Sequence, residues 1–388
     1  MSKIRKREWV APNGTPKSAW QVDYRDQSGA RRSKQFARKK DAEAWLVGAA
    51  WQVSQGTHTA DSQSVTVAKA ADLWIERAER EARERSTVKQ YRELARLHIN
   101  PLLGAVKLSR LSRPMVETFR DDLLKDRSKA MAGKAVRALS SIIHEAQKRG
   151  LVAQNVAQGV KVIRKGRERA RIEIPSQAEL RAILKAAGDD TRALLLVAIL
   201  TGLRSSELRG LRWSDIDLKG ATISVAQRAD AWGIIGPPKS DAGYRTIPIA
   251  PALVAELKRW KLRARPSALG LAFPNAKGGA YLHNNLVRRV VGPVMVAAGV
   301  CEPVMVKGEP KLDAKGQPVL APRYGLHALR HAAASAWIAQ RIDLKRLQTW
   351  MGHASIQITL DTYGHLIADS DRDADLVAAA GAELMGAG

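Results

Sequence analysis

Cysteine is nearly absent from the sequence, and its scarcity excludes two kinds of site. Cys301 is the one cysteine among 388 residues, so the chain can form neither an intramolecular disulfide nor a zinc site built from cysteines. Scarce thiols are typical of proteins that work in a reducing compartment. We therefore expect a cytoplasmic protein.

Long apolar segments are missing as well. The longest apolar run covers residues 193–200, far short of the roughly 20 residues that a membrane-spanning helix requires. The basic first residues lead into polar sequence and not into the apolar stretch of a signal peptide. We expect a protein that has no contact with a membrane.

Aromatic residues amount to 5% of the chain, although hydrophobic residues make up 45% of it. The apolar supply is therefore mainly Ala, Leu, Val and Ile, a balance that favours helices over strands. We expect a mainly α protein with small β elements, of the α+β class, divided into two or three domains by its length.

Acidic residues are heavily outnumbered. The chain has 38 Asp and Glu against 64 Lys and Arg, which gives a formal net charge of +26 and a pI near 10.5. Such an excess of positive charge favours a polyanionic partner. Double-stranded DNA is the partner we expect, for a protein associated with the nucleoid.

Alternating hydrophobicity and turn signals predict a small sheet-plus-helix module at residues 1–58. Strands are expected at 19–24 and 33–36, and a helix at 40–53. Basic side chains crowd these strands and their flanks: Lys3, Arg5, Lys6, Arg7, Arg25, Arg31, Arg32 and Lys34. They indicate either a surface that grips phosphates or a solvated basic face, and the sequence leaves both open.

Two further domains follow this module. The polar segment 54–64 has the composition of a flexible linker, and residues 65–164 show a periodicity that predicts about four helices. The charged run 165–171 indicates a second linker. A mixed domain at 172–388 opens with a capping box formed by Ser176 and Glu179.

Polar candidates for chemistry concentrate in the third domain. Arg204 follows an apolar helix at a glycine turn, and Ser205 or Ser206 is expected to cap the next helix. Short strands are expected at 221–227 and 245–249.

The last hundred residues add two histidines, an arginine and a tyrosine. His327 and Arg330 begin a helix, where their spacing puts both on one face. His353 directly follows a glycine that ends a helix, and Tyr363 lies on a short helix. That helix is expected to turn its apolar residues partly into the core: Ile356, Ile358 and Leu360.

These segments resemble the tyrosine recombinases, the family of phage integrases and Xer-type resolvases. The resemblance rests on Thr-Gly-Leu-Arg-Ser-Ser-Glu-Leu (201–208), His-Ala-Leu-Arg-His (327–331), Met-Gly-His-Ala-Ser (351–355) and Leu-Asp-Thr-Tyr-Gly-His (360–365), in the family's order. Pro-Lys-Ser (238–240) resembles the β-hairpin that carries the family's catalytic lysine at its tip. In outline, the first two domains resemble the family's arm-type and core-binding (SAM-like) DNA-binding domains.

The resemblance implies catalysis without metal or other cofactor. Tyr363 would attack a DNA phosphodiester, and Arg204 and Arg330 would bind the non-bridging oxygens, where charge develops. His353 would add a hydrogen bond to the phosphate. Lys239 would protonate the departing 5′ oxygen.

Each of these residues also has an ordinary explanation. His327 and His331 could be a metal pair, but Arg330 between them adds repulsion against a cation. Lys239 in a proline-rich turn would normally be solvated, and Tyr363 alone would be a core residue with a wet hydroxyl. Their joint occurrence, in order, favours catalysis, with His327 assisting proton transfer at Tyr363.

We expect a site-specific recombinase that integrates and excises a phage or other mobile element through a covalent 3′-phosphotyrosyl bond. Its expected partners are core and arm DNA sites, a homotetramer of its own copies, and a directionality factor or host DNA-bending protein. Alternatives are a resolvase of chromosome or plasmid dimers, a relaxing enzyme of topoisomerase type, and a catalytically silent DNA-binding protein. The sequence assigns no role to the inserted hairpin expected at 303–322 or to the tail at 367–384.

Overall fold

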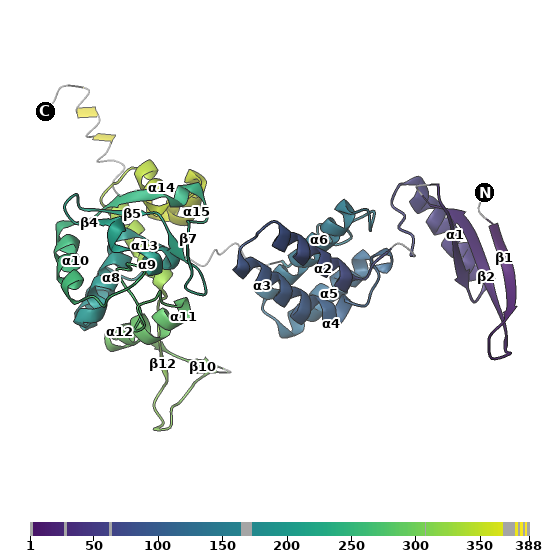
Figure 1. Ribbon diagram of the computed structural model, residues 1–388, viewed down its shortest axis with the longest axis horizontal. Coiled ribbons are helices and arrows are strands. Elements are labelled where there is room, and N and C mark those ends of the chain that lie inside the picture. The colour runs from purple at the N-terminus through teal and green to yellow at the C-terminus, as the bar shows by residue number, and fades with distance from the viewer. Residues whose placement is uncertain are drawn as a thin grey trace. The chain divides into compact units, whose positions relative to one another are not determined.

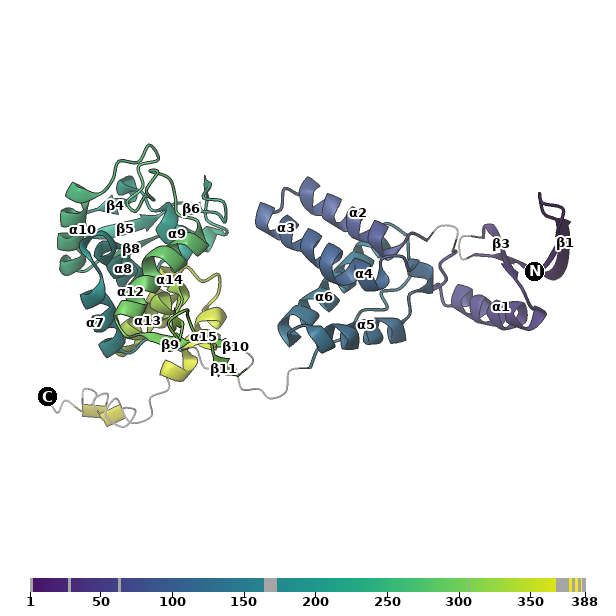
Figure 2. The same cartoon turned by 90° about the horizontal axis from the view of Figure 1, so that it is seen from below.

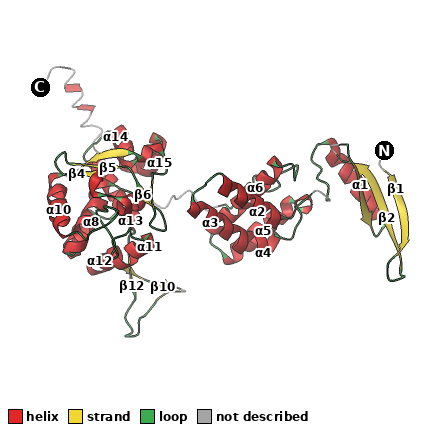
Figure 3. Cartoon of the chain, in the orientation of Figure 1, coloured by secondary structure: helices red, strands yellow, loops and turns green. Residues whose placement is uncertain are grey.

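The computed structural model describes residues 3–26, 29–61, 64–163, 173–306 and 308–367, with a few tail residues at 377–378, 381–382 and 385 (Figure 1). The chain forms two compact units, residues 1–167 and 168–388. Helices dominate and most strands are short (Figure 3), which confirms the predicted mainly α fold with small β elements. Within the described ranges, no helix is long and apolar enough to cross a membrane. The expected second linker and most of the tail lie outside these ranges.

The first unit begins with a three-stranded antiparallel sheet in the order β1-β2-β3. The strands are β1 (Lys3–Val10), β2 (Pro16–Arg25) and β3 (Arg31–Phe36), and α1 (Lys39–Ser54) packs on one face of the sheet. Val22 is fully buried there, and the Tyr24 ring meets Trp45 edge-on at a centroid distance of 5.0 Å. The sequence predicted β2, β3 and α1. It missed β1, because that strand is basic and largely exposed and has no apolar alternation.

The other face of this sheet is cationic. The register pairs odd-numbered residues of β1 with odd-numbered residues of β2, and the same holds for β2 and β3. Since side chains alternate between faces, these residues point away from Val22 and α1. The cations of this open face are Lys3, Arg5, Arg7, Arg25 and Arg31.

Side-chain contacts fix the segment that follows α1. The Asp61 carboxylate forms ion pairs with Lys34 of β3 at 3.0 Å and with Arg110 at 3.2 Å, and it accepts a hydrogen bond from the Ser109 hydroxyl at 2.5 Å. Burial alone would raise the pKa of Asp61, but the hydrogen bonds from Ser109 and Lys34 outweigh it and lower the pKa to about 2. The flexible linker predicted from composition is therefore wrong at this residue.

The rest of the first unit is a helical bundle. Its segments are α2 (Val67–Arg80), a continuous run of α3 (Arg85–Leu94), the π-helix η1 (Ala95–Ile99) and α4 (Asn100–Leu103), then η2 (Leu108–Arg110), α5 (Arg113–Asp126) and α6 (Lys129–Lys148). In its core, the rings of Trp74 and Tyr91 stack at 3.9 Å. Pro101 does not end this run, because it lies in the first turn of α4, where no helical N–H is needed.

The second unit combines a small sheet with helices (Figure 2). The antiparallel sheet has the order β4-β5-β8, formed by β4 (Ile216–Asp217), β5 (Thr222–Val225) and β8 (Arg245–Pro248). The central helix α8 (Asp189–Thr201) packs against α10 (Pro251–Arg263) and α13 (Leu326–Ala339). Because α8 is apolar on nearly every side, it lies in the core of this unit.

Shorter elements surround this core. Ser176 and Glu179 form the predicted capping box at the start of α7 (Gln177–Ala186). The inserted hairpin is also confirmed: β9 (Cys301–Pro303) pairs with β12 (Leu320–Pro322), and β10 (Met305–Val306) pairs with β11 (Glu309–Pro310). The other elements are α9 (Ser205–Gly210), η3 (Trp213–Asp215), β6 (Arg228–Ala229), β7 (Ile235–Gly236), η4 (Asp241–Gly243), α11 (His283–Leu286), η5 (Val287–Val291), α12 (Gly292–Ala297), α14 (Leu344–Met351) and α15 (Ile356–Ile367).

Candidate active site

Arg204 stands at the N-cap of α9, where a carboxylate holds it. Its backbone N–H donates to Oε2 of Glu207 at 2.8 Å, and its Nη1 donates to Oε1 at 2.7 Å. Its Nη2 donates to the carbonyl oxygen of Gly352. The predicted cap by Ser205 or Ser206 is wrong, because Glu207 in the first turn of the helix takes the cap N–H.

Glu207 is shared by a second arginine on the neighbouring sheet. Arg245 of β8 donates to both carboxylate oxygens at 3.1 and 2.8 Å, and the two side chains are only 1% and 3% exposed. Arg245 also donates to the carbonyl oxygens of Trp350 at 2.7 Å and Gly243 at 3.0 Å. Burial alone would raise the pKa of Glu207, but Arg245 and then Arg204 outweigh it and lower the pKa to about 2. The carboxylate is therefore ionised at neutral pH and holds both guanidiniums.

Arg330 is fixed by backbone carbonyls. It is 2% exposed, its Nη1 donates to Gly202, and its Nη2 donates to Met351. Gly202 ends α8 at φ +59°, and a Cβ there would lie 3.0 Å from the Met351 sulfur, so the turn requires glycine. Burial, and then the charge of Arg204, lowers the pKa of Arg330 to about 9. The guanidinium is thus still protonated at neutral pH.

His353 follows a second left-handed glycine turn. Gly352 ends α14 at φ +64°, and a Cβ there would lie 2.9 Å from Nη1 of Arg245. The Nδ1 of His353 lies 2.9 Å from the Thr359 hydroxyl. Burial, and then the charge of Arg330, lowers the pKa of His353 to about 4, so its imidazole is neutral at pH 7.

Tyr363 is buried in the same cluster. Its side chain is 1% exposed, and its hydroxyl oxygen lies 2.8 Å from Nδ1 of His331 on α13. The His353 ring lies nearly parallel to the phenol ring, at a centroid distance of 6.3 Å and an angle of 14°. Burial raises the pKa of Tyr363 to about 12, against the opposing charge of Arg330. The phenol therefore keeps its proton at neutral pH.

The inward face of α15 differs from the prediction. Ile356, Ile358 and Leu360 are 39%, 44% and 38% exposed, so their expected inward orientation is wrong. Thr359 and Tyr363 occupy the buried positions, at 0% and 1%. These two are four residues apart, as the helical repeat requires, whereas the apolar residues alternate with a strand-like spacing of two.

The two remaining predicted residues lie further out. His327 is exposed, and its ring meets His331 edge-on at a centroid distance of 4.6 Å. Lys239 is exposed in the connection between the antiparallel strands β5 and β8, after the small β6–β7 pair that this connection contains. Near the end of this loop, the Gly243 carbonyl accepts a hydrogen bond from Arg245, which connects the loop to Glu207.

The sequence interpretation assigned no role to several groups that hold this cluster together. Glu207 and His331 lie inside the recognised motifs, and their spacing from Arg204 and Arg330 places them in the same helical turns. Arg245 lies in a strand, and no local signal connects it with Glu207, which is 38 positions away. Only the tertiary fold brings these last two together.

The cluster has the chemistry of an anion site. Positive charge from Arg204, Arg245 and Arg330 exceeds the negative charge of Glu207, while His331 and His353 are neutral at pH 7. Rigid cations without enough local anions attract an external one. Hydrogen bonds to backbone and carboxylate fix the arginines in advance, which suits stabilisation of a charged transition state.

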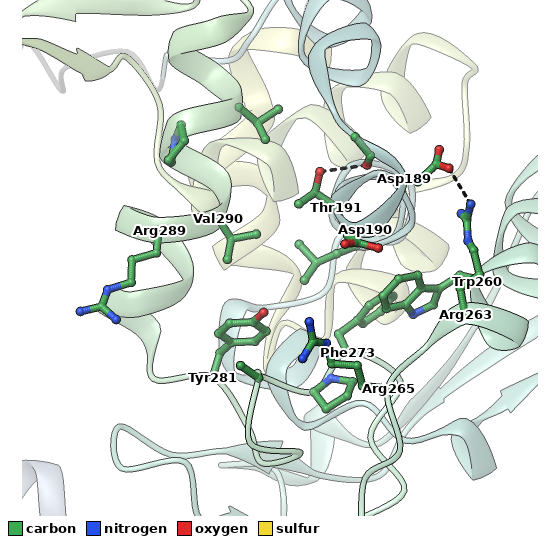
Figure 4. Close-up of a pocket in the computed structure, with 16 residues that line it drawn as sticks. Asp189, Asp190, Thr191, Trp260, Arg263, Arg265, Phe273, Tyr281, Arg289 and Val290 are labelled. Atoms are coloured by element: carbon green, nitrogen blue, oxygen red, sulfur yellow. Dashed lines mark hydrogen bonds and ion pairs between the residues drawn. The ribbon is translucent and has the colours of Figure 1, made fainter.

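A separate cavity of about 710 Å³ lies between the start of α8, the end of α10 and η5 (Figure 4). Asp189 pairs with Arg263 there at 2.6 Å, and Asp190, Arg265 and Tyr281 also line it. None of the predicted catalytic residues lines this cavity. The candidate chemistry therefore belongs to the buried polar cluster and not to this hollow.

A model of the phage integrase family matches residues 175–292 and 310–369. All the predicted catalytic residues fall inside these ranges: Arg204, Lys239, His327, Arg330, His353 and Tyr363. The unmatched stretch between the ranges contains β9 and β10 of the inserted hairpin.

Proteins of similar sequence are named as tyrosine recombinases or integrases. A "tyrosine recombinase XerC-like" protein of Caldanaerobacter subterraneus subsp. tengcongensis is 27% identical, over 88% of this chain and 90% of its own length. The prophage integrase IntR of Escherichia coli is 24% identical, over 78% of this chain and 77% of its own.

Solved structures show the same fold. The Tn1549 transposon integrase in complex with transposon right end DNA has a TM-score of 0.64 at 19% identity, over 81% of this chain and 100% of its own. A lambda integrase tetramer bound to a Holliday junction has a TM-score of 0.56 at 19% identity, over 90% and 95%. From the family model, the relatives and the fold together, we conclude that the chain belongs to the phage integrase family, the tyrosine recombinases that cut and rejoin DNA.

Proposed function

We propose that this recombinase cuts DNA by attack of Tyr363 on a phosphodiester and holds the cut strand as a 3′-phosphotyrosyl ester. The observation that carries the proposal is a buried phenol beside a guanidinium that is fixed in advance. Arg330 is held by the carbonyl oxygens of Gly202 and Met351, and its charge acts on the pKa of Tyr363. A rigid cation next to the nucleophile is what attack on an anionic phosphate requires.

Arg204, Arg330 and His353 bind the phosphate in this proposal. The Arg204 side chain is 36% exposed, so N–H groups remain for a ligand while Glu207 holds the guanidinium. His353 is neutral, and when its Nδ1 accepts from Thr359 its proton is on Nε2, which can donate to a phosphate oxygen. Together these donors neutralise the charge that builds on the non-bridging oxygens.

Lys239 supplies the proton for the departing 5′ oxygen. Its exposed position on the loop before β8 suits a group that meets DNA only when DNA binds. His327, at the surface beside His331, assists proton transfer at Tyr363. A substrate with sulfur in place of the bridging 5′ oxygen tests the lysine, because a thiolate leaves without a proton. We expect Lys239→Ala to be slow on oxygen and near wild type on sulfur.

Integration and excision of a mobile element are the proposed biological role. The cationic open face of the β1-β2-β3 sheet suits a second, arm-type DNA site, while the helical bundle and second unit bind the core site. A homotetramer carries out the exchange, helped by a directionality factor or a host DNA-bending protein. A tetramer on a Holliday junction is known for the lambda integrase, which has the same fold.

A suicide substrate tests the proposal directly. Purified wild type and Tyr363→Phe are incubated with nicked DNA that carries the element's own attachment sequence, and covalent adduct is scored on a denaturing gel. We expect adduct with wild type and none with Tyr363→Phe, which lacks the attacking oxygen. DNA-bound wild type that forms no adduct would contradict the proposal and favour the silent DNA-binding alternative.

A further inference from the structure

His331 makes a contact that none of the proposed roles uses. Its Nδ1 lies 2.8 Å from the hydroxyl oxygen of Tyr363, and the two rings meet at 65° with centroids 5.6 Å apart. His331 directly follows Arg330 on α13, whereas Tyr363 lies on α15. The contact thus joins the helix that holds the phosphate-binding arginine to the helix that holds the nucleophile.

We propose that His331 is a further catalytic residue, which takes the phenolic proton of Tyr363 during attack and returns it during rejoining. This inference rests on the proposed function and names the proton acceptor of the same site. The geometry satisfies the first requirement of a general base, since the acceptor nitrogen is within hydrogen-bond distance of the proton that it removes.

Burial makes such a base necessary. The Tyr363 side chain is 1% exposed, so bulk water has little access to its hydroxyl. Burial also raises the pKa of Tyr363 to about 12, so the phenol does not ionise by itself at neutral pH. Attack therefore requires an acceptor inside the cluster, and His331 is in hydrogen-bonding contact with the hydroxyl.

The charges around His331 keep it ready to accept. Burial, then His327 and Arg330, lowers the pKa of His331 to about 4, so its imidazole is neutral at pH 7. Tyr363 faces it from α15, and His353 from the turn before that helix interacts with it electrostatically. A bound phosphodiester adds negative charge to the cluster, which offsets the arginines and raises the proton affinity of His331 when it is needed.

The proton transfers balance over the whole cycle. In cleavage, the O–H bond of Tyr363 breaks toward Nδ1 of His331, the tyrosine oxygen bonds to phosphorus, and the bond from phosphorus to the 5′ oxygen breaks. The leaving oxygen takes a proton from Lys239. In rejoining, the attacking 5′ hydroxyl returns a proton to Lys239, and the departing tyrosine oxygen recovers its own from His331. No co-reactant is consumed.

His331→Asn separates proton transfer from positioning. An asparagine amide can keep a hydrogen bond to Tyr363 near the place of Nδ1, but it cannot take the proton. We would measure single-turnover adduct formation on the suicide substrate from pH 6 to pH 10. We expect His331→Asn to be slower by about 100-fold at pH 7, which is the lower end of the rate enhancement typical of general acid–base catalysis. Its rate should rise steeply with pH, because hydroxide then removes the proton.

His365→Asn is the matched control, an exposed histidine on the same helix as Tyr363, and it should match wild type at every pH. Added imidazole should partly restore His331→Ala, because a small base can enter the vacated space. A rate for His331→Asn within threefold of wild type, with a parallel pH profile, would overturn the His331 assignment and leave the proposed function standing. Failure of wild type itself to form adduct would overturn both.

Discussion

The cations of this enzyme are held in two contrasting ways. In the second unit, Arg245 and Arg330 are almost fully buried, and carboxylate or carbonyl oxygens bind them. On the open face of the N-terminal sheet, the cations are largely exposed, and Arg5 is 58% exposed even while it pairs with Asp23. The first arrangement fixes direction, and the second supplies charge.

The difference matches two kinds of work. A transition state needs donors at fixed positions, because donors that must reorganise during the reaction contribute less to the rate. Binding a DNA backbone needs mainly a number of cations, each of which releases counterions and contributes modestly. Loss of one buried arginine should therefore have a large, specific effect, whereas loss of one exposed arginine should have a small, general one.

The largest expected effect is on Arg330. Lysine in its place keeps the charge but cannot span the carbonyl oxygens of Gly202 and Met351 and a phosphate at once. We expect Arg330→Lys to slow adduct formation by about 1,000-fold or more, with DNA affinity within about threefold of wild type. Arg346→Lys, an exposed arginine on α14, is the control for a conservative change outside the cluster. Equal losses of DNA binding and of cleavage would show that Arg330 acts through DNA affinity and not on the transition state.

Glu207→Gln should have the next largest effect, on stability as well as rate. It removes the charge that holds Arg204 and Arg245, and leaving the buried guanidinium of Arg245 without its partner costs about 3–5 kcal/mol. Since the folded pKa of about 2 lies below the ordinary 4.5, this contribution is full above pH 4.5 and is lost as the pH falls toward 2.

Calorimetric unfolding of wild type and Glu207→Gln at several pH values measures this contribution. The gap between the two melting temperatures should be wide at pH 7 and should close on acidification. A gap that does not depend on pH would mean that the ionised carboxylate is not what stabilises the cluster.

Smaller effects are expected on the N-terminal sheet. The double variant Arg5→Gln, Arg7→Gln should weaken binding of arm DNA by roughly tenfold and reduce the salt slope of log Kd by about 0.9 for each phosphate that these arginines neutralise. Cleavage of a core-only substrate should be unchanged. Arg38→Gln is the control, because Arg38 is 83% exposed at the start of α1 and not on the open face. Unchanged arm binding in the double variant would favour a resolvase without an arm site.

The smallest expected effect is at Asp61. This carboxylate links Lys34 with Ser109 and Arg110 but is 25% exposed, so solvent screens its ion pairs. We expect Asp61→Asn to lower the free energy of unfolding of the first unit by about 1 kcal/mol or less. Denaturant unfolding, with exposed Asp72→Asn as control, measures the change. A loss of several kcal/mol would show that the segment around Asp61 is held as firmly as the buried polar cluster of the second unit.

Local features of the fold were predictable from the sequence. The capping box of Ser176 and Glu179 and the glycine turn at Gly352 were predictable because they depend on residues within one helical turn. The predicted positions of Arg204, just after an apolar helix, and of Arg330, near the beginning of a helix, are confirmed for the same reason.

Contacts between residues far apart in the sequence could not be predicted from local patterns. Glu207 meets Arg245 across 38 positions, and His331 meets Tyr363 across 32, and no periodicity encodes either pair. The prediction for the inward face of α15 is wrong because it rested on the hydrophobicity of the side chains and not on their helical spacing. On that helix, a buried threonine and tyrosine displace the isoleucines from the core.

Identification of the DNA-linked residue would establish the nucleophile. The adduct from the suicide substrate would be digested with trypsin and nuclease, and the nucleotide-bearing peptide sequenced by mass spectrometry. Tyr363 is the only tyrosine in the expected tryptic peptide, residues 347–372. We expect the nucleotide on Tyr363, and its attachment to any other residue, such as Tyr324, would contradict the assignment of the nucleophile.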